Sequence, residues 1–317
     1  MLNAVLPYAL MTFGLVLLYF GAEWLVGGSA KMAVRFGVKP LLVGLTIVAF
    51  GTSAPELVVS VQSALAGVGG IAVGNVVGSN IVNIGLILGL SAVISPIHIT
   101  RKLLRFDVPV VVGASFLVWW ILSDGVVSVL DGVILLALFT TYIGFNIISA
   151  KREKDVTPPE MEEILTKKKD PVSKDLFFII AGLTLLVMGA RLLVQGAVEI
   201  ATRFGISEAV IGLTIVSIGT SLPELATSIV AAVKKQNDIA VGNIIGSNLF
   251  NIFCILGVAG VLGPINFGGI ELRDILVMLV LAVLLLPMLW TRFTLHRWEG
   301  AILLAIYGGY LVAVWPR

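Results

Sequence analysis

Two apolar segments of the chain each contain a proline followed by a glutamate. Residues 48–60 read V-A-F-G-T-S-A-P-E-L-V-V-S, and residues 216–228 read V-S-I-G-T-S-L-P-E-L-A-T-S. Proline cannot donate the backbone hydrogen bond that a helix interior needs. An ionisable side chain at membrane depth usually marks an ion or substrate pathway. We therefore predict that the two glutamates, Glu56 and Glu224, bind ions.

The proline in each segment is expected to free backbone oxygens. Pro55 leaves the carbonyl four residues earlier without its donor, and irregular backbone at membrane depth is tolerated where it lines a cavity. We expect the carbonyls of residues 49–52 to point into such a cavity, beside the hydroxyls of Thr52 and Ser53. Residues 217–224 supply the same set of groups in the second segment.

A second motif follows each proline segment. Residues 74–83 read G-N-V-V-G-S-N-I-V-N, and residues 242–251 read G-N-I-I-G-S-N-L-F-N. Ser79 and Asn83 are four residues apart, so they share one face of a helix. Asn80 points elsewhere on that helix and is expected to be structural. The motif thus adds hydroxyl and amide oxygens to the predicted site.

The chemistry of these groups favours hard cations. The candidate ligands are all oxygens, and calcium takes about 6–8 of them. The set contains no histidine or cysteine, which disfavours zinc, copper and iron. Two ionised glutamates balance one divalent ion, whereas three monovalent ions would leave the loaded site with one positive charge. The net charge of the loaded site therefore differs between its calcium-bound and its sodium-bound state.

The composition predicts an integral membrane protein. Of the 317 residues, 58% are hydrophobic and 13% are charged, and the mean hydropathy is +1.06; soluble domains carry about 25% charged residues. The single cysteine excludes an intramolecular disulfide. We read the N-terminus as a retained helix, not a cleaved signal peptide. Ten apolar spans are expected, at residues 4–30, 40–64, 71–95, 106–123, 129–150, 175–202, 208–233, 239–263, 274–291 and 299–315.

The chain contains an internal repeat without gaps. Adding 168 to a position in the first half gives its counterpart in the second half, a relation that we call the repeat offset. Between Val43 and Gly89, 26 of 47 positions are identical to their counterparts. Because each half has five expected spans, an odd number, consecutive halves must be inverted in the membrane. We expect an all-α polytopic protein of ten transmembrane helices, with two inverted five-helix repeats and broken helices at the ion site. The repeats are 1–150 and 175–317, joined by a cytoplasmic linker, 151–174.

Charge placement supports this topology. With the N-terminus outside, 17 of the 21 Lys and Arg residues fall in cytoplasmic loops, in agreement with the positive-inside rule. Equivalent loops of the two halves also differ in charge: Lys31 corresponds to Glu199, and Asp124 corresponds to Arg292. Both termini are therefore predicted to be extracellular.

The motifs resemble the alpha repeats of the sodium/calcium exchangers, within the cation/calcium exchanger superfamily. The resemblance covers nearly the whole chain, and the short central loop is similar to that of a minimal prokaryotic member. It implies that calcium binds the carboxylates of Glu56 and Glu224 and the carbonyls of Thr52 and Thr220. It implies that sodium binds those glutamates and further groups: Ser53, Ser79 and the Ala49 carbonyl toward one side, Ser221, Ser247 and the Ser217 carbonyl toward the other, and Asn83 and Asn251 in the middle.

These expectations together predict a secondary antiporter. It exchanges sodium for calcium by alternating access, is electrogenic, and extrudes calcium across the plasma membrane. Spans one and six slide against the remaining helices, by analogy of fold. We expect no cofactor, no enzymatic activity and no nucleic-acid partner, and a functional monomer within the lipid bilayer. Two alternatives remain: an antiporter that exchanges protons for calcium or another divalent cation, and a non-transporting membrane ion sensor or scaffold.

Overall fold

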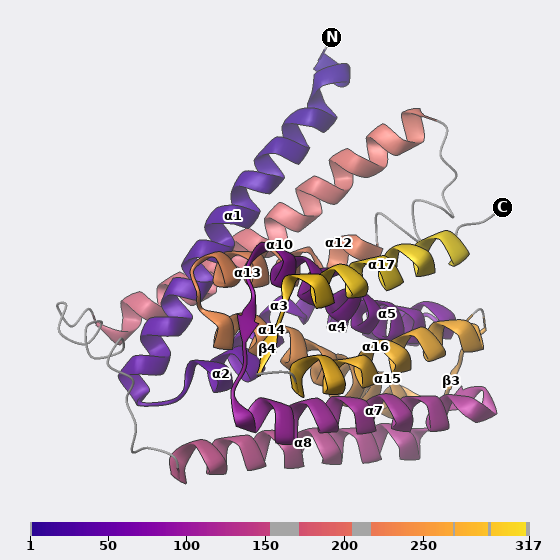
Figure 1. The fold of residues 1–317 in the computed structure, drawn as a ribbon. Coiled ribbons are helices and arrows are strands. Elements are labelled where there is room, and N and C mark those ends of the chain that lie inside the picture. Colours follow the sequence, from indigo (N-terminus) through magenta and orange to yellow (C-terminus); the bar gives the residue numbers. More distant parts are fainter. Residues whose placement is uncertain (1, 153–170, 205–216, 269, 291–292, 315–317) are drawn as a thin grey trace.

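The computed structural model describes residues 2–152, 171–204, 217–268, 270–290 and 293–314, and these residues are mostly helical (Figure 1). The expected linker therefore lies largely outside the described residues, as do the first residues of the expected seventh span. Within residues 2–152, the elements are α1 (Leu2–Phe36), α2 (Pro40–Val43), η1 (Gly44–Val48), α3 (Ala49–Thr52), α4 (Ala54–Leu65), α5 (Gly69–Ile81), η2 (Val82–Leu88), α6 (Gly89–Ile94), β1 (Ile97–His98), η3 (Leu103–Asp107), α7 (Val108–Ile121), η4 (Leu122–Asp124), β2 (Val126–Val127) and α8 (Val129–Arg152).

The second part of the chain repeats this order. Its elements are α10 (Val172–Arg203), α12 (Ser217–Thr220), α13 (Leu222–Val233), α14 (Asn237–Leu249), η6 (Phe250–Ile255), α15 (Leu256–Leu262), β3 (Ile265–Asn266), α16 (Leu272–Trp290), β4 (Thr294–Leu295) and α17 (Arg297–Val314). The repeat offset converts the bounds of α3, α4, α5, β1 and β2 into those of α12, α13, α14, β3 and β4. The repeat in sequence is therefore a repeat in structure.

The short strands show how the two halves are related. β1 pairs with β4, with Ile97 opposite Leu295, and β2 pairs with β3, with Val127 opposite Ile265. The repeat offset converts the first pairing into the second. Each half thus supplies one strand to each antiparallel pair, which is the pattern of two units related by a twofold axis.

Seven helices among the described residues are long and apolar enough to cross a membrane, or eight if the bent pair 40–52 and 54–65 is one span. Ten were expected. α13 alone is too short, and residues 205–216 before it are not described. α17 carries Arg297 and Glu299 in its first turn, which lowers its hydropathy. The structure thus supports seven to eight spans directly.

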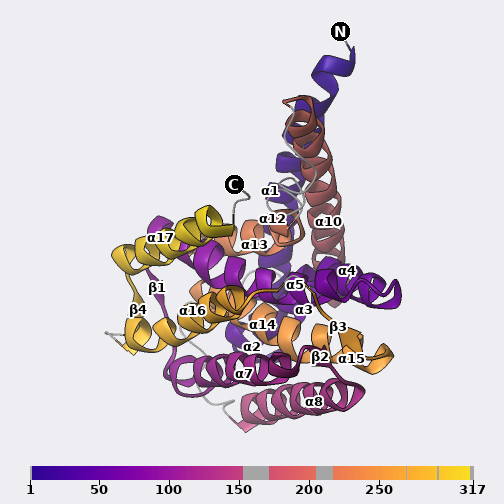
Figure 2. The ribbon, with the colours of Figure 1, turned by 90° about the vertical axis from the view of Figure 1, so that its right-hand side faces the viewer.

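α1 and α10 lie side by side and project beyond the other helices (Figures 1 and 2). Glycines allow the close approach. A Cβ atom on Gly21 would lie 2.8 Å from the carbonyl oxygen of Gly182, and one on Gly14 would lie 2.7 Å from that of Gly189. By the repeat offset, Gly21 corresponds to Gly189 and Gly14 corresponds to Gly182, so each of these contacts is the equivalent of the other. Small residues at such crossings let membrane helices pack backbone to backbone.

The core lies around α5 and α14 with their continuations. In the apolar stretch within residues 69–94, 72% of the residues are buried, and in the stretch within residues 237–262, 83% are buried. In α10, only 28% of the apolar stretch is buried. In a membrane, the low value for α10 describes a helix that faces lipid over most of its surface. The two central helices are therefore the frame of the candidate site, and α1 and α10 cover it from one side.

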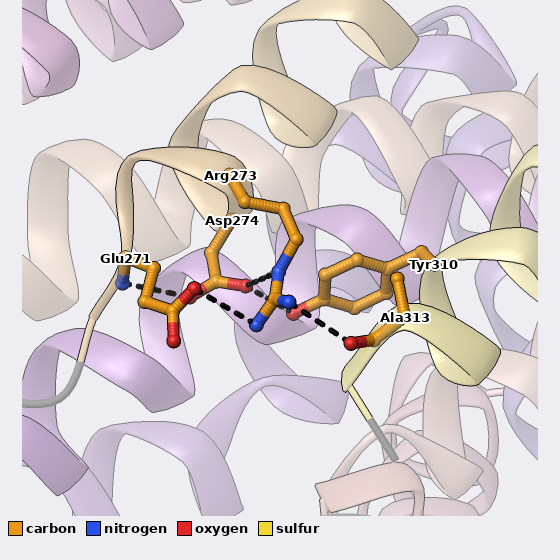
Figure 3. A network of polar contacts seen from close by, with 5 residues as sticks. All are labelled: Glu271, Arg273, Asp274, Tyr310 and Ala313. Carbon is orange, nitrogen blue, oxygen red and sulfur yellow. Dashed lines mark hydrogen bonds and ion pairs between the residues drawn. The ribbon is translucent and has the colours of Figure 1, made fainter. Parts of the chain in front are cut away.

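A polar network ties the beginning of α16 to the end of α17 (Figure 3). The carboxylate of Asp274 accepts from the hydroxyl of Tyr310 at 3.1 Å and from the backbone N–H of Glu271 at 2.9 Å. Arg273 donates to the carbonyl of Ala313 at 2.9 Å. Buried carboxylates need such partners, so the network fixes the angle between two outer helices.

The equivalent pair joins η3, directly before α7, to α8, and its two residues are 35 positions apart along the chain instead of 36. Tyr142 donates to Asp107 at 2.9 Å. The repeat offset converts Tyr142 into Tyr310, but it converts Asp107 into Ile275, the residue after Asp274. The π-helical segment η3 ends at Asp107, and a π-helical turn accommodates an additional residue. The repeat offset is unchanged on both sides of this helix, at β1 and β2, so the one-residue difference is local to the aspartate.

Candidate ion-binding site

The two glutamates lie in the first turns of α4 and α13, directly after the breaks. Glu56 and Glu224 are each 1% exposed. The helices α3 and α4 meet at a bend of 48°, and Pro55 falls at the start of α4, where its missing N–H costs no helical bond. Helix N-termini stabilise nearby carboxylates. The sequence thus builds the break and places the acid at the favourable end of the new helix.

Each glutamate is hydrogen-bonded to a serine of the other half. Ser53 donates to Oε1 of Glu224 at 2.7 Å, and Ser221 donates to Oε1 of Glu56 at 3.2 Å. The hydroxyl of Ser247 lies 2.9 Å from that of Ser53. Ser79 is its counterpart and lies 3.5 Å from Ser221. The two breaks therefore form one continuous buried site, centred between the halves.

Four acceptor oxygens at this site have no hydrogen-bond donor among the described residues. They are Oε2 of Glu56, Oε2 of Glu224, Oδ1 of Asn83 and Oδ1 of Asn251, and all four are buried. A buried acceptor without a donor is costly, and native proteins contain few of them. Carboxylate and amide oxygens are ligand types that calcium takes in proteins, so these residues fit a hard cation as cargo.

The backbone oxygens differ from the expectation. Pro55 does leave the carbonyl of Gly51 without its donor four residues later, because proline has no N–H. The carbonyl of Ala49 is not freed, since it accepts the backbone N–H of Ser53 at 3.0 Å. In the second half, the N–H of Ser221 bonds to the carbonyl of Ile218 at 3.1 Å. The carbonyl of Ala49 thus keeps only one lone pair for another partner.

The remaining predicted residues fall into three groups. Thr52 is buried and contacts Asn243. Ser217 and Thr220 are the ends of the short helix α12, beside the site glutamate of the second half. Asn83 donates through Nδ2 to Oδ1 of Asn248 at 3.3 Å, which leaves its own Oδ1 for a ligand.

Four residues that support the glutamates were not among the predicted ligands. Asn75 donates to Ser60 at 2.8 Å and to the carbonyl of Glu56 at 3.0 Å. Asn243 donates to Ser228 at 3.0 Å and to the carbonyl of Glu224 at 3.4 Å. All four are polar residues that recur at the repeat offset. That recurrence was the available signal.

Asn80 behaves as expected, but its counterpart does not. Asn80 donates to the carbonyl of Val76 in its own helix at 2.7 Å, a structural contact. Asn248, its equivalent, accepts from Asn83 within the site. The described residues contain no cluster of three or more His, Cys, Asp or Glu side chains that could hold a metal.

Comparison with known proteins identifies the family. A family model described as "Sodium/calcium exchanger protein" matches residues 6–148 and 174–315. The chain belongs to the sodium/calcium exchanger family. The match spans both halves and includes the segments that contain both breaks and both glutamates.

Relatives of this family cover the chain almost completely. The "Putative antiporter CaxA" of Alkalimonas amylolytica is 38% identical over 310 residues, 94% of this chain and 95% of its own length. The "Sodium/calcium exchanger MaX1" of Methanosarcina acetivorans is 30% identical, with 97% and 98% covered. A structure of the sodium-calcium exchanger NCX_Mj matches with a TM-score of 0.84 at 35% identity and covers 99% of both chains.

These similarities place the protein in a functional class. It is an integral membrane protein and a cation/calcium antiporter, a member of a family of transporters, not of enzymes. The resemblance inferred from the G-T-S-x-P-E segments is thereby confirmed.

Proposed function

We propose that this antiporter exchanges sodium for calcium and extrudes calcium from the cell. The observation that carries the proposal is the pair of buried glutamates, each bonded to a serine of the other half and each with one unpaired oxygen. Calcium would bind the carboxylates of Glu56 and Glu224 and the carbonyls of Thr52 and Thr220. This set has two negative charges and oxygen ligands only, as calcium requires.

The sodium sites would overlap the calcium site. Sodium ions would share the two glutamates and use two flanking groups of oxygens. These are Ser53, Ser79 and the carbonyl of Ala49 on one side, Ser221, Ser247 and the carbonyl of Ser217 on the other, and the amides of Asn83 and Asn251 between them. Because both ion species would use the same two glutamates, one ion species must displace the other. Binding is then competitive, which is what an exchanger needs.

Charge explains why only loaded states would cross. Two buried carboxylates without a cation carry a large desolvation cost, so the empty site resists reorientation through the membrane. One calcium cancels that charge, and three sodium ions exceed it by one. Exchange of three sodium ions for one calcium would therefore move net charge, and transport would be electrogenic.

We further propose ten transmembrane helices in two inverted repeats, 1–150 and 175–317, joined by the cytoplasmic linker 151–174. The constant offset of the element bounds and the exchanged strand pairings support the repeat. The placement of Lys and Arg supports extracellular termini. The site lies between the halves of a single chain, which supports a functional monomer in the plasma membrane.

Alternating access would come from movement of α1 and α10 together. Arg35 of α1 forms an ion pair of 2.7 Å with the buried Asp175 of α10, which ties the two helices. They contact the core asymmetrically. A Cβ on Gly51 would meet Leu183 at 2.6 Å, and one on Gly219 would meet Val194. Both Leu183 and Val194 lie on α10. Under the repeat symmetry, the opposite state would place α1 at these glycines instead.

Calcium flux in proteoliposomes tests the proposal. Purified protein is reconstituted, and calcium uptake is measured under an outward sodium gradient, a pH gradient, or neither. Uptake driven by sodium and accelerated by a potential of the appropriate sign is expected. Uptake that follows only the pH gradient would identify a proton-coupled antiporter, and no uptake under any gradient would leave a membrane sensor or scaffold.

A further inference from the structure

Asn243 of α14 connects the two breaks through one buried side chain. It has no exposed surface. Its amide nitrogen donates to Ser228 at 3.0 Å and to the carbonyl of Glu224 at 3.4 Å. Its oxygen lies 3.1 Å from the hydroxyl of Thr52, which belongs to the break of the other half. A single amide thus contacts the acid of one half and the broken helix of the other.

The orientation of this amide is determined by its partners. The carbonyl of Glu224 can only accept a hydrogen bond, so the NH₂ group of Asn243 must face it. The amide oxygen then faces Thr52, and an amide oxygen can only accept. The hydroxyl of Thr52 must therefore be the donor in this contact.

The hydroxyl of Thr52 has one proton and several acceptors within reach, among them the carboxylate of Glu224. Besides Oδ1 of Asn243 at 3.1 Å, it lies 3.3 Å from the carbonyl oxygen of Ala49. That carbonyl already accepts the backbone N–H of Ser53 at 3.0 Å, so it has one lone pair left. If Thr52 donated to Ala49, it would occupy the last lone pair of a proposed sodium ligand.

We propose that Asn243 is a positioning residue that draws the Thr52 hydroxyl away from Ala49 and so keeps the Ala49 carbonyl available to sodium. The inference rests on the proposed function, since it concerns one of the sodium ligands proposed there. Asn243 lies in the second half of the chain, whereas the sodium ligand that it keeps available, the carbonyl of Ala49, lies in the first half.

Close packing of α14 against the first break makes this contact possible. A Cβ on Gly246 would lie 2.7 Å from the carbonyl oxygen of Leu45 and 2.8 Å from the Cβ of Ala49. Gly242 approaches Gly44 in the same way, with 3.1 Å between an added Cβ and the Cα of Gly44. The glycines on either side of Asn243 bring its helix near enough for the amide to reach Thr52.

The decisive experiment is a double-mutant cycle on sodium dependence. Asn243→Leu removes one acceptor of the Thr52 hydroxyl and leaves the carbonyl of Ala49 among those that remain. Thr52→Val removes the competing proton but retains the backbone. Sodium-driven calcium transport is measured in proteoliposomes as a function of sodium for wild type, both single variants and the double variant. Asn146→Leu is the matched control, because Asn146 is also fully buried and donates to the carbonyl of Tyr142 in α8, away from the site.

We expect N243L to raise the sodium concentration for half-maximal transport by roughly three- to tenfold, the scale of one lost polar contact. The N243L/T52V double variant should return to the value of T52V, and N146L should keep the wild-type value. Asn243→Ala removes the same oxygen with a smaller side chain and carries the same expectation, in case N243L does not fold.

Three results would separate the ways in which the proposal can fail. If N243L and N243A keep the wild-type sodium dependence, Asn243 does not control a sodium ligand. If the double variant is as impaired as N243L, the Asn243 contact is structural support only, and the competition for Ala49 is wrong. If calcium transport by the wild-type protein does not depend on sodium at all, the proposed function itself fails. The wild-type measurement alone shows this, before any variant is compared with it.

Discussion

At the scale of single residues, the site depends on oxygens whose hydrogen bonds are only half used. Each glutamate has one carboxylate oxygen bonded to a serine and one without a donor. The bonded oxygen holds the carboxylate in place, since hydrogen bonds to charged groups are worth about 1.5–3 kcal/mol. The unpaired oxygen keeps its lone pairs for the cation of the proposed site. The charge of the carboxylate and its hydrogen bond with serine can therefore be removed by separate mutations.

Removal of the charge should abolish calcium exchange. Glu56→Gln and Glu224→Gln retain an oxygen for the serine bond but leave the site one negative charge short of calcium. We expect each variant to lose sodium-driven calcium uptake in proteoliposomes by roughly a hundredfold or more, since an unbalanced buried charge costs several kcal/mol. Glu199→Gln, a half-exposed glutamate of α10, is the matched control. Near-normal uptake by both site variants would falsify the assignment.

Loss of the serine bonds should have a smaller and unequal effect. Ser53 donates to its glutamate at 2.7 Å, whereas Ser221 does so at 3.2 Å. Shorter charge-assisted bonds are stronger, so Ser53→Ala should raise the calcium concentration for half-maximal transport by roughly tenfold, and Ser221→Ala by less. Ser91→Ala is the control, because the buried hydroxyl of Ser91 has no partner to lose among the described residues. Equal effects of the two site variants would contradict the argument.

Spacing predicted that the two glutamates and their neighbouring serines would lie together, because proline, glutamate and serine at fixed offsets determine a broken helix and its polar face. It did not predict that each serine bonds to the opposite glutamate, since that depends on how the halves meet. It also did not predict the Ser53 N–H bond to Ala49. A break at Pro55 frees only the carbonyl whose donor is missing, and the neighbouring carbonyls can keep theirs.

At the scale of elements, α1 and α10 are attached to the core by few polar links within the part of the chain that the structure describes. One of these is an ion pair between Glu23 of α1 and Lys234, just after α13, with 2.5 Å between Oε1 and Nζ. The equivalent positions are Arg191 and Ala66, which cannot form an ion pair. If the opposite state exchanges the roles of α1 and α10, this link exists in one state only.

We therefore expect the Glu23–Lys234 pair to bias the transport cycle. Glu23→Gln should change the ratio of calcium transport rates in the two directions by about two- to fivefold, the range of a half-exposed ion pair. The reversed pair, Glu23→Lys with Lys234→Glu, should restore the wild-type ratio. Glu199→Gln again serves as the control, because its 2.6 Å ion pair with Arg203 lies within one helix. A reversed pair no better than Glu23→Gln would show that the link plays no part in the cycle.

The elements themselves were largely predictable, and the exceptions have physical causes. Apolar length located the helices, because a membrane span needs about 20 apolar residues. It could not locate η3, since a π-helical turn depends on packing against neighbours and leaves no mark on hydropathy. The pairing of Tyr142 with Asp107 was missed for the same reason: the repeat offset aligns Asp107 with Ile275 instead of Asp274.

At the scale of the whole molecule, the two halves are alike in structure and unlike in charge. The turn after α4 and the turn after α13 show this most simply. Gly67 and Lys235 are equivalent, and both have a positive φ, 75° and 58°. A left-handed conformation is easy for glycine and costly for lysine, so the same turn was kept although the residue changed. Conservation of the turn with a change of charge is expected if its two copies face opposite sides of a membrane.

Site-directed labelling tests this inversion directly. Cys254, the single cysteine, is replaced by alanine, and Ala66→Cys or Lys234→Cys is introduced at equivalent exposed positions of the two turns. In sealed right-side-out vesicles, a membrane-impermeant maleimide should label A66C at once and K234C only after the membrane is permeabilised, because the positive-inside rule places Lys234 in the cytoplasm. Labelling of both cysteines from the same side would mean that the halves are parallel. The site could then no longer be related to itself by a twofold axis in the membrane plane, and α1 and α10 could not exchange roles between the two states.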